Sequence, residues 1–329
     1  CSSPEGARDY LVPARNHPGK FYALPQAPQQ FKQILMASGF DRYFQIAPCF
    51  RDEDARADRS PGEFYQLDME MAFASQEDVF SIVEQVLPPV FEKYGIYKEA
   101  SKAPFVRIPY LEAMDKYGSD KPDLRIDLVL TDATEVMQGC GFAAFEGQTV
   151  KAIVVDGFTA TRKQIDAICA EVEVQTARKG FWFRVDENGE FVGGISKFLQ
   201  DRKEEVIKAL GLKNGDFVGL AAGKKLEAQK TAGVYRKLLG AASEKHMKKD
   251  CYEFCWIVDF PMYEIGEESG ELEFCHNPFS MPQGGMDALN NQDPLEILAY
   301  QYDLVCNGVE LSSGAVRNHD PEIMIKAFE

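Results

Sequence analysis

The chain has 329 residues and a formal net charge of −16, with 52 acidic against 36 basic side chains. This length can bury a large core and favours two domains over one, while the negative charge argues against a broad nucleic-acid surface. Eight cysteines without a CxxC pair and only four histidines argue against a zinc site and favour a reducing compartment. No apolar run reaches the roughly 18 residues of a membrane span and no signal peptide opens the chain, so a soluble, cytoplasmic protein without a membrane partner is predicted.

The N-terminal third of the chain predicts short strands and two helices. Strands are expected at 9–13 and 21–24, and a helix begins at Pro28 and ends at Met36. Residues 75–98 predict an amphipathic helix that a Pro-Pro pair interrupts or kinks.

Residues 40–74 predict two antiparallel strands joined by a charged loop. One face of each strand is apolar and is expected to lie in a core: Phe44, Ile46, Phe50, Tyr65, Leu67, Met69, Met71 and Phe73. The opposite face carries polar side chains: Arg51, Glu53, Gln66, Asp68 and Glu70. An ordinary hairpin with one solvated face remains possible on spacing alone. However, loop 51–59 mixes three arginines with four acids, which suits a site that grips phosphates and holds a cation or an ammonium group.

The middle of the chain changes from a hairpin-rich pattern to mixed helix and strand patterns, which predicts an inserted α+β domain. A turn is expected at 118–123, before the change in texture. The inserted segment is expected to contain a buried strand, a helix, a hairpin with a type I′ turn at Asn188–Gly189, and two further helices: 150–155, 161–176, 181–192, 196–211 and 225–248. The predicted domain boundaries are 1–125, 126–250 and 251–329.

The last part of the chain begins with a strand at 254–262 that is apolar on both faces. A helix is then predicted from Asp293–Pro294 to Asn307–Gly308, followed by a strand at 309–317. Asp303 and Glu310 therefore lie on adjoining elements. They are either solvated at a helix end or, if the elements fold back, they converge into a site for Mg²⁺, which binds one or two carboxylates plus phosphates.

Three segments of the hairpin carry a resemblance to a known family. Residues 50–53, 56–59 and 63–68 resemble motif 2 of class II aminoacyl-tRNA synthetases, in the variant of the bacterial aspartyl-tRNA synthetases. Residues 4–9 and 29–32 resemble the aspartate-binding segments of that family. The resemblance implies an α+β fold with an antiparallel sheet flanked by helices, interrupted by an inserted α+β domain.

The same resemblance implies roles for individual side chains. Arg51 and Glu53 are implied as catalytic, and Arg51, Asp52, Glu53 and Glu310 as ATP-binding. Asp303 and Glu310 are the implied metal ligands. The implied aspartate-binding residues are Glu5, Gln29, Lys32, Asp68, His276 and Arg317. For Glu310 and Arg317 to reach one pocket, the strand needs a bulge near Ser313–Gly314.

The implied activity is ligation of aspartate to tRNA. L-Aspartate reacts with ATP, assisted by Mg²⁺, and the activated amino acid passes to the 3′ end of tRNA-Asp, with tRNA-Asn left open as a second acceptor. The family also implies a homodimer. The basic residues of the inserted segment either contact tRNA or form a solvated helix face: Lys224, Lys225, Lys230, Arg236 and Lys237.

Two parts of the family architecture are not found in the printed residues, namely the N-terminal anticodon-binding barrel and the third motif. A chain that ended at Glu329 is therefore expected to be nearly inactive. Two rival functions remain: an aspartate–ammonia ligase paralogue, which activates the β-carboxylate, and a non-catalytic binding module derived from a synthetase.

Overall fold

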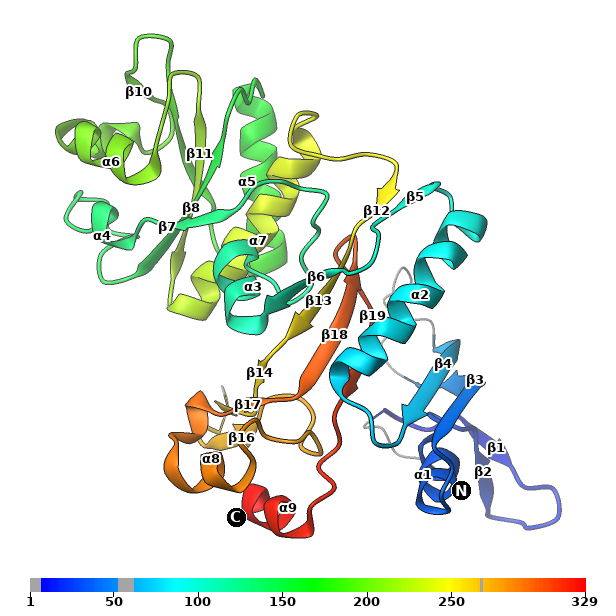
Figure 1. The fold of residues 1–329 in the computed structure, drawn as a ribbon. Coiled ribbons are helices and arrows are strands. Elements are labelled where there is room, and N and C mark those ends of the chain that lie inside the picture. The colour runs from blue at the N-terminus through cyan, green and yellow to red at the C-terminus, as the bar shows by residue number, and fades with distance from the viewer. Residues whose placement is uncertain (1–6, 53–61, 267–268) are drawn as a thin grey trace. The chain divides into compact units, whose positions relative to one another are not determined.

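The computed structural model describes residues 7–52, 62–266 and 269–329. The chain forms two compact units, Cys1–Phe80 and Ser81–Glu329 (Figure 1). Each unit is an α+β structure and is described on its own below. None of the helices in these described ranges is long and apolar enough to cross a membrane.

The first unit contains two hairpins and a helix. Strands β1, Leu11–Pro13, and β2, Phe21–Ala23, pair antiparallel, and helix α1 spans Gln29–Ala37. Strands β3, Arg42–Phe50, and β4, Glu63–Met71, form the second antiparallel hairpin, with Gln45 opposite Asp68. These elements confirm the strands and the helix that the sequence predicts.

The predicted orientation of the β3–β4 hairpin is wrong for the part of the chain that the structure describes. The apolar face is open, since Phe44, Ile46 and Tyr65 are 70%, 65% and 73% exposed. The opposite face is the packed one, where Cys49 and Asp68 are buried and contact is made with α1. The physical reason is that α1 brings a buried lysine to the polar face, so the hairpin's local core is built around charged groups.

The second unit is organised around a four-stranded sheet of order β19-β18-β13-β6. Its strands are β6, Val106–Pro109, β13, Phe254–Val258, β18, Gln301–Cys306, and β19, Val309–Ala315. Only the β13–β6 pair is parallel, and the other neighbours are antiparallel. Helix α3, Tyr110–Tyr117, follows β6, and the sheet core includes Ile257 and Val305.

Helix α2, Gln76–Tyr94, is tied to this sheet by one buried carboxylate. It continues through the predicted Pro-Pro interruption. The Glu84 Oε1 atom accepts hydrogen bonds from the backbone N–H of Phe105 at 3.0 Å, from Arg107 Nη1 at 3.2 Å and from Trp256 Nε1 at 2.9 Å. Glu84 therefore joins α2 to β6 and β13.

We expect Glu84→Leu to lower the free energy of unfolding by about 3 kcal/mol, because it leaves two buried N–H donors and the half-buried Arg107 guanidinium without their acceptor. Glu84→Gln keeps an acceptor and should cost less. Glu92→Leu, at an exposed position of the same helix, is the matched control. Urea unfolding followed by circular dichroism measures all three, and equal losses for Glu84→Leu and Glu92→Leu would contradict the role of Glu84.

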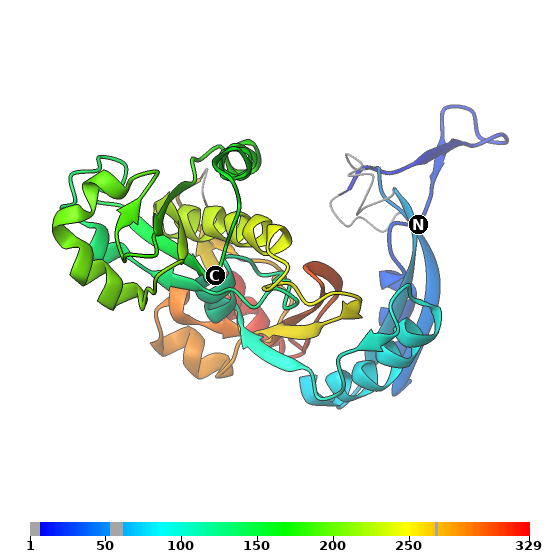
Figure 2. The ribbon, with the colours of Figure 1, turned by 90° about the horizontal axis from the view of Figure 1, so that it is seen from above.

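The inserted segment of the second unit folds around a five-stranded antiparallel sheet of order β10-β9-β11-β8-β7. The strands are β7 Leu130–Asp132, β8 Thr149–Val155, β9 Phe181–Val185, β10 Phe191–Val192 and β11 Phe217–Gly223. The helical elements are α4 Thr134–Met137, α5 Arg162–Thr176, η1 Ser196–Phe198, η2 Gln200–Arg202, α6 Lys203–Leu210 and α7 Lys225–Ala242. Helices α5 and α7 cover one face, where both views show them side by side (Figures 1 and 2). This agrees with the predicted α+β texture.

The predicted type I′ turn of the β9–β10 hairpin is wrong. Of its two central residues only Gly189 has a positive φ, of 78°. Instead, Asp186 accepts backbone N–H bonds from Asn188 and Glu190 through its side chain. The aspartate folds a longer loop that needs a single glycine in the left-handed region.

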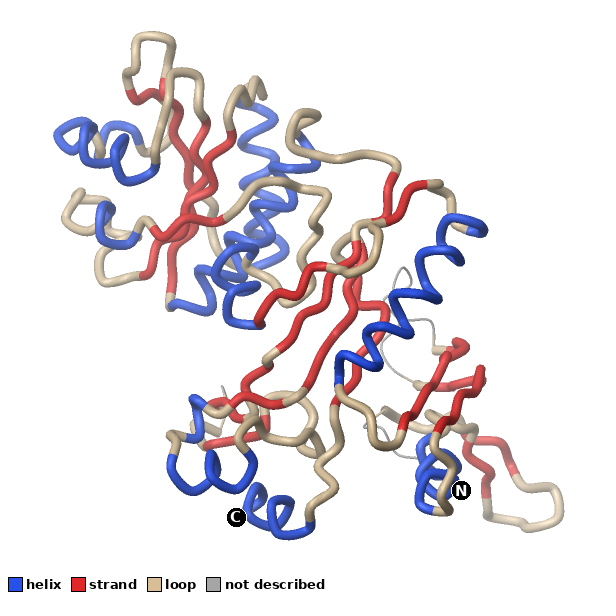
Figure 3. The backbone as a smooth tube through the Cα atoms, in the orientation of Figure 1, coloured by secondary structure: helices blue, strands red, loops and turns tan. Residues whose placement is uncertain are grey.

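The predicted helix at 293–307 is also wrong. Only a 3₁₀ turn, η3 at Pro294–Glu296, follows Asp293, and the chain then forms β17, Leu298–Ala299, and β18 (Figure 3). Asn307 and Gly308 have φ of 52° and 80°, and they join Cys306 of β18 to Val309 of β19. Two central residues with positive φ form the tight hairpin turn for which Asn-Gly is the strongest short signal, so the predicted helix stop is in fact a hairpin turn.

The bulge expected near Ser313–Gly314 occurs earlier in β19. The register shifts between Leu304 and Val305, which pair with Ser312 and Glu310, so that Leu311 is the extra residue. Gly314 has a different role. A Cβ on Gly314 would lie 2.4 Å from the Tyr302 ring, so glycine lets that ring lie across the neighbouring strand.

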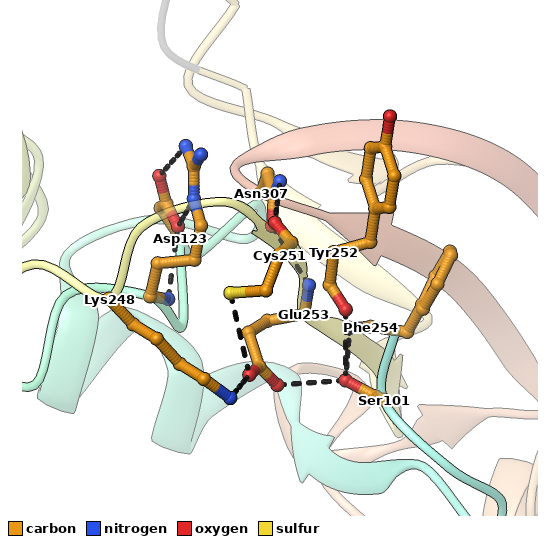
Figure 4. A network of polar contacts seen from close by, with 9 residues as sticks. Ser101, Asp123, Lys248, Cys251, Tyr252, Glu253, Phe254 and Asn307 are labelled. Carbon is orange, nitrogen blue, oxygen red and sulfur yellow. Dashed lines mark hydrogen bonds and ion pairs between the residues drawn. The ribbon is translucent and has the colours of Figure 1, made fainter. Parts of the chain in front are cut away.

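The remaining elements complete the second unit. They are β5 Glu99–Ala100, β12 Cys251–Tyr252, β14 Phe260–Pro261, β15 Tyr263–Ile265, β16 Leu272–Phe274, α8 Gly285–Asn291 and α9 Pro321–Phe328. A polar network joins β12, the β18–β19 turn and the segment after β5 (Figure 4). Glu253 accepts bonds from Lys248 and from Ser101 Oγ, and Asn307 Oδ1 accepts the Glu253 N–H at 2.9 Å. This network fixes the return of the chain from the inserted segment to the four-stranded sheet.

Candidate active site

In the first unit, the polar face of the β3–β4 hairpin is built around a buried lysine. Lys32 of α1 lies with its Nζ atom 2.7 Å from Asp68 Oδ1 and 2.9 Å from Glu70 Oε1. Burial acts to lower the pKa of Lys32, but the bonds and charges of the two carboxylates outweigh it and the pKa is raised. The ammonium group is therefore charged in this setting.

The three charged groups leave one net negative charge on this face. Asp68 Oδ1 also accepts a bond from Gln66 Nε2 at 3.3 Å, while the buried Oδ2 atom has no partner among the described residues. A surplus carboxylate with a free oxygen can bind an incoming ammonium group, and the lysine can bind a carboxylate. The arrangement suits a small zwitterion. Sequence reasoning placed Glu70 on this face but gave it no part in the site.

Arg51 lies at the end of β3 with its guanidinium held on two sides. Its Nε donates to the backbone carbonyl of Gln26 at 3.3 Å, and its Cζ lies 5.3 Å from the centre of the Phe64 ring. Gln26 is itself buried and donates to Asp9 Oδ1 at 2.6 Å. Arg51 is thus oriented by its surroundings while its terminal nitrogens keep donors for a phosphate or a carboxylate.

The other predicted residues of this unit are less constrained or lie outside the described ranges. Gln29 begins α1, three residues before Lys32, which places both on one helix face. Asp52 is paired with Arg8 at 3.8 Å near the surface. Glu5 and Glu53 fall on residues that the structure does not describe.

In the second unit, the two predicted metal ligands lie on neighbouring strands rather than on a helix and a strand. Asp303 sits in the middle of β18 and is 6% exposed, and Glu310 lies near the start of β19. Asp303 Oδ1 is buried and has no hydrogen-bond partner in the described ranges. Burial, and then the charge of Glu310, raise the pKa of Asp303 to about 8. The Asp303 carboxyl group is therefore buried beside a second acid, with one oxygen that no described residue hydrogen-bonds.

These features fit a divalent cation. A positive ion would satisfy the orphaned Asp303 oxygen and the neighbouring Glu310 charge together. No group of three or more His, Cys, Asp or Glu side chains within the described residues is arranged to hold a metal. Two carboxylates without a third suit Mg²⁺, which takes one or two protein carboxylates and completes its shell with waters and phosphates.

A lysine that the sequence placed only in a turn lies at the same acids. Lys121 Nζ is 3.1 Å from Glu310 Oε2 and 3.0 Å from Asp120 Oδ2. Burial acts to lower the pKa of Lys121, and the bonds to Asp120 and Glu310 outweigh it and raise it. No local pattern in the sequence indicated this contact, because it depends on how the 118–123 turn packs against the β18–β19 hairpin.

His276 and Arg317 lie on two segments that run side by side. Ser280 pairs with Arg317 as an isolated antiparallel bridge, and Met281 donates its N–H to the carbonyl of Val316 at 2.8 Å. The His276 ring makes an edge contact with Phe260, with ring centres 5.1 Å apart. Arg317 is exposed and forms no ion pair with a described residue, so its guanidinium is available to a ligand.

Unsatisfied polar atoms mark the same region. Ser280 Oγ and Asn318 Nδ2 are buried and have no partner in the part of the chain that the structure describes. Both belong to the paired segments that carry His276 and Arg317. Buried polar groups normally have partners, so orphaned atoms of this kind indicate a place where water or a ligand binds.

The basic residues of the inserted segment separate into two groups. Arg236 is 2% exposed and donates to the backbone carbonyls of Asp123, Ile126 and Leu128. Arg236 therefore attaches α7 to the segment 123–128 inside the protein. The prediction that it belongs to a solvated or tRNA-contacting surface is wrong. Lys224 is exposed and lines a pocket of about 570 Å³ together with Arg178 and Lys179, although Arg178 is paired with Glu227.

Comparison with known proteins gives matches over the whole chain. A family model described as "tRNA synthetases class II (D, K and N)" matches residues 1–329. An "Aspartate--tRNA ligase" from Streptomyces coelicolor is 58% identical over 331 residues, covering 100% of this chain and 56% of the relative. An "Aspartate--tRNA(Asp/Asn) ligase" from Rickettsia bellii is 56% identical over 339 residues, again covering 100% of this chain and 56% of the relative.

The chain spans about half the length of the curated relatives it matches. Among solved structures, "Aspartyl tRNA synthetase from Entamoeba histolytica" matches at 17% identity and a TM-score of 0.38, covering 92% of this chain and 40% of that chain. The family match extends over both units, including the polar hairpin, the inserted segment and the acidic strand pair. The chain belongs to the class II tRNA synthetases of the D, K and N group.

Proposed function

We propose that the protein to which this chain belongs is an aspartate–tRNA ligase. It activates L-aspartate with ATP to aspartyl-adenylate and transfers the aspartate to the 3′ end of tRNA-Asp. The observation that carries this proposal is the Lys32–Asp68–Glu70 cluster, a buried charged face matched to a zwitterion, in a chain 58% identical to a relative named aspartate–tRNA ligase. The proposed domain boundaries are 1–125, 126–250 and 251–329.

Each unit supplies part of the chemistry. In the first unit, Asp68 and Gln29 hold the substrate ammonium, Lys32 binds the side-chain carboxylate, and Arg51 holds the attacking carboxylate and the α-phosphate. In the second unit, Arg317 and His276 bind the side-chain carboxylate. The reaction needs little covalent help from the protein, because orientation and charge stabilisation lower most of its barrier.

Asp303 and Glu310 would hold Mg²⁺, which supplies charge neutralisation at the phosphates. Glu5 is proposed to lie near the aspartate ammonium. Asp52 and Glu53 are proposed to bind ATP. Lys224 and its basic neighbours are proposed as a contact for tRNA, with a solvated surface as the alternative. A homodimer is proposed from the family alone, and a cytoplasmic location from the cysteine usage and the hydropathy of the sequence.

A product assay on the complete gene product tests the proposal. The protein is incubated with aspartate and ATP, and then with tRNA-Asp, tRNA-Asn or ammonia. Aspartyl-tRNA-Asp is the expected product, and the tRNA-Asn arm decides whether the second acceptor named for the Rickettsia bellii relative applies here. Asparagine formed from ammonia would establish the ammonia ligase instead, and no product in any arm would favour a binding module.

A further inference from the structure

The acidic pair on β18 and β19 already has a cation beside it. Lys121 bridges Asp120 and Glu310, with Nζ–O distances of 3.0 and 3.1 Å. We infer that Lys121 takes the place of the metal at Glu310 when the site is free, and that it must release Glu310 before a divalent cation can bind. Lys121 thereby lowers the metal affinity of the site. This inference rests on the proposed metal-binding role of Asp303 and Glu310.

The backbone that carries Lys121 is held in place from two sides. At the end of α3, Gly118 packs so closely on α7 that a Cβ there would lie 2.2 Å from the carbonyl of Gln229. On the other side, a Cβ on Gly308 would lie 3.3 Å from Asp123 Cβ and 3.7 Å from the carbonyl of Lys121. The 118–123 turn therefore packs between helix α7 of the inserted segment and the β18–β19 hairpin. Its contact on the hairpin is Gly308, two residues before Glu310.

The Lys121 side chain, in contrast, is partly exposed and can move away from Glu310. The Lys121 side chain is 38% exposed, and it keeps Asp120 as a partner when Glu310 is taken by another cation. Leaving Glu310 thus gives up one ion pair of two. Displacement is feasible because the two remaining charges stay paired in partly solvated surroundings.

The need for a second cation comes from Asp303. The lysine reaches Asp120 and Glu310, but the buried Asp303 Oδ1 atom has no partner among the residues described. A divalent ion can serve both Asp303 and Glu310, whereas the ammonium group serves only Glu310. Metal and lysine therefore compete for one carboxylate while only the metal satisfies the other.

Competition of this kind predicts a gain in affinity when the lysine charge is removed. We expect Lys121→Met to bind Mn²⁺ about tenfold more tightly than the natural protein, a coupling at the lower end of the usual range. Lys121→Arg keeps the charge and should stay near the natural value. Lys116→Met removes another lysine, paired with Glu112 on the surface of α3, and is the matched control with unchanged affinity.

The measurement is a titration of the complete gene product with Mn²⁺ alone, without nucleotide, following the free ion by electron paramagnetic resonance. Thermal melting of Lys121→Met with Mn²⁺ and with EDTA gives a second readout, in which the metal should restore stability lost with the lysine. A Lys121→Gln variant repeats the test if the methionine variant does not fold.

The possible outcomes separate this inference from the proposed function. If natural protein binds Mn²⁺, and Glu310→Gln abolishes the binding, but Lys121→Met and Lys121→Gln bind no more tightly than Lys116→Met, the role of Lys121 is overturned and the metal site stands. If natural protein binds no Mn²⁺ that depends on Asp303 or Glu310, the metal site itself is wrong and the inference is overturned with it.

Discussion

Lys32→Met is expected to lower the free energy of unfolding by about 3–5 kcal/mol, because it leaves the buried Asp68 and the half-buried Glu70 without their shared cation. The same substitution should reduce binding of L-aspartate by two decades or more, since the side-chain carboxylate loses a buried partner. Urea unfolding and calorimetric titration of the complete gene product measure the two effects.

The double variant Lys32→Met/Glu70→Gln separates stability from recognition. Removing one of the two uncompensated carboxylates should recover part of the lost stability and none of the aspartate affinity. Lys116→Met, in an exposed pair, controls for loss of a lysine as such and should cost less than about 1 kcal/mol. Wild-type aspartate affinity in Lys32→Met would remove Lys32 from the site.

Asp303→Asn is expected to make the metal-free protein more stable at alkaline pH. The pKa of Asp303 is raised from its ordinary 3.8 to about 8, so between these values the folded state retains a proton that the unfolded state has lost. The stability of the natural protein therefore contains a contribution that falls as pH rises through this window, and asparagine removes it. We expect the gain of the variant over natural protein to grow by about 2–4 kcal/mol between pH 5 and pH 8.

Urea unfolding in EDTA at pH 5, 6.5 and 8 measures this difference, and Asp201→Asn at an exposed position is the control. The same Asn variant should lose Mn²⁺ binding, so that stability and metal affinity change in opposite directions. A variant that is less stable than natural protein at pH 8, or a difference independent of pH, would contradict the isolation of the Asp303 carboxylate.

Local sequence patterns predicted most helices and strands. They failed at residues 293–308, where helix-end signals and a hairpin-turn signal fall on the same residues. Asp293–Pro294 is a good helix start and Asn307–Gly308 a possible helix stop, yet the segment between them contains β18, which is buried along its whole length. Burial between two neighbouring strands decided the outcome, and the Asn-Gly pair formed a hairpin turn with both φ values positive. A helix-length segment with a hairpin signal at its end was open to both interpretations.

The hairpin at residues 42–71 illustrates a different limit. Alternation correctly separated the apolar face from the polar face, but which face is packed depends on the element that meets it. Helix α1 carries Lys32 to the polar face, and this pairing of residues 36 positions apart leaves no mark on local periodicity. Of the large apolar side chains on the other face, Phe44, Ile46, Tyr65, Leu67 and Met69 are exposed in the described structure.

Those residues of the candidate site that belong to sequence motifs could be predicted from the sequence. Asp303 and Glu310 were identified together, and the structure places them on adjoining strands. Lys121 and Glu70, which bind predicted site residues directly, were missed as contributors because their contacts depend on tertiary packing. Motifs indicate which residue types meet the substrate, and packing determines which other charges those residues meet.

Aspartate-dependent exchange of pyrophosphate into ATP by the complete gene product is the most direct test of the claim that this chain carries an aspartate-activating site. We expect exchange with L-aspartate, little with L-asparagine, and a loss of about two to three and a half decades in the exchange efficiency with aspartate for Arg317→Ala, since about 3–5 kcal/mol of charge pairing to the bound substrate is removed. Equal exchange with asparagine, or undiminished exchange by Arg317→Ala, would contradict the claim.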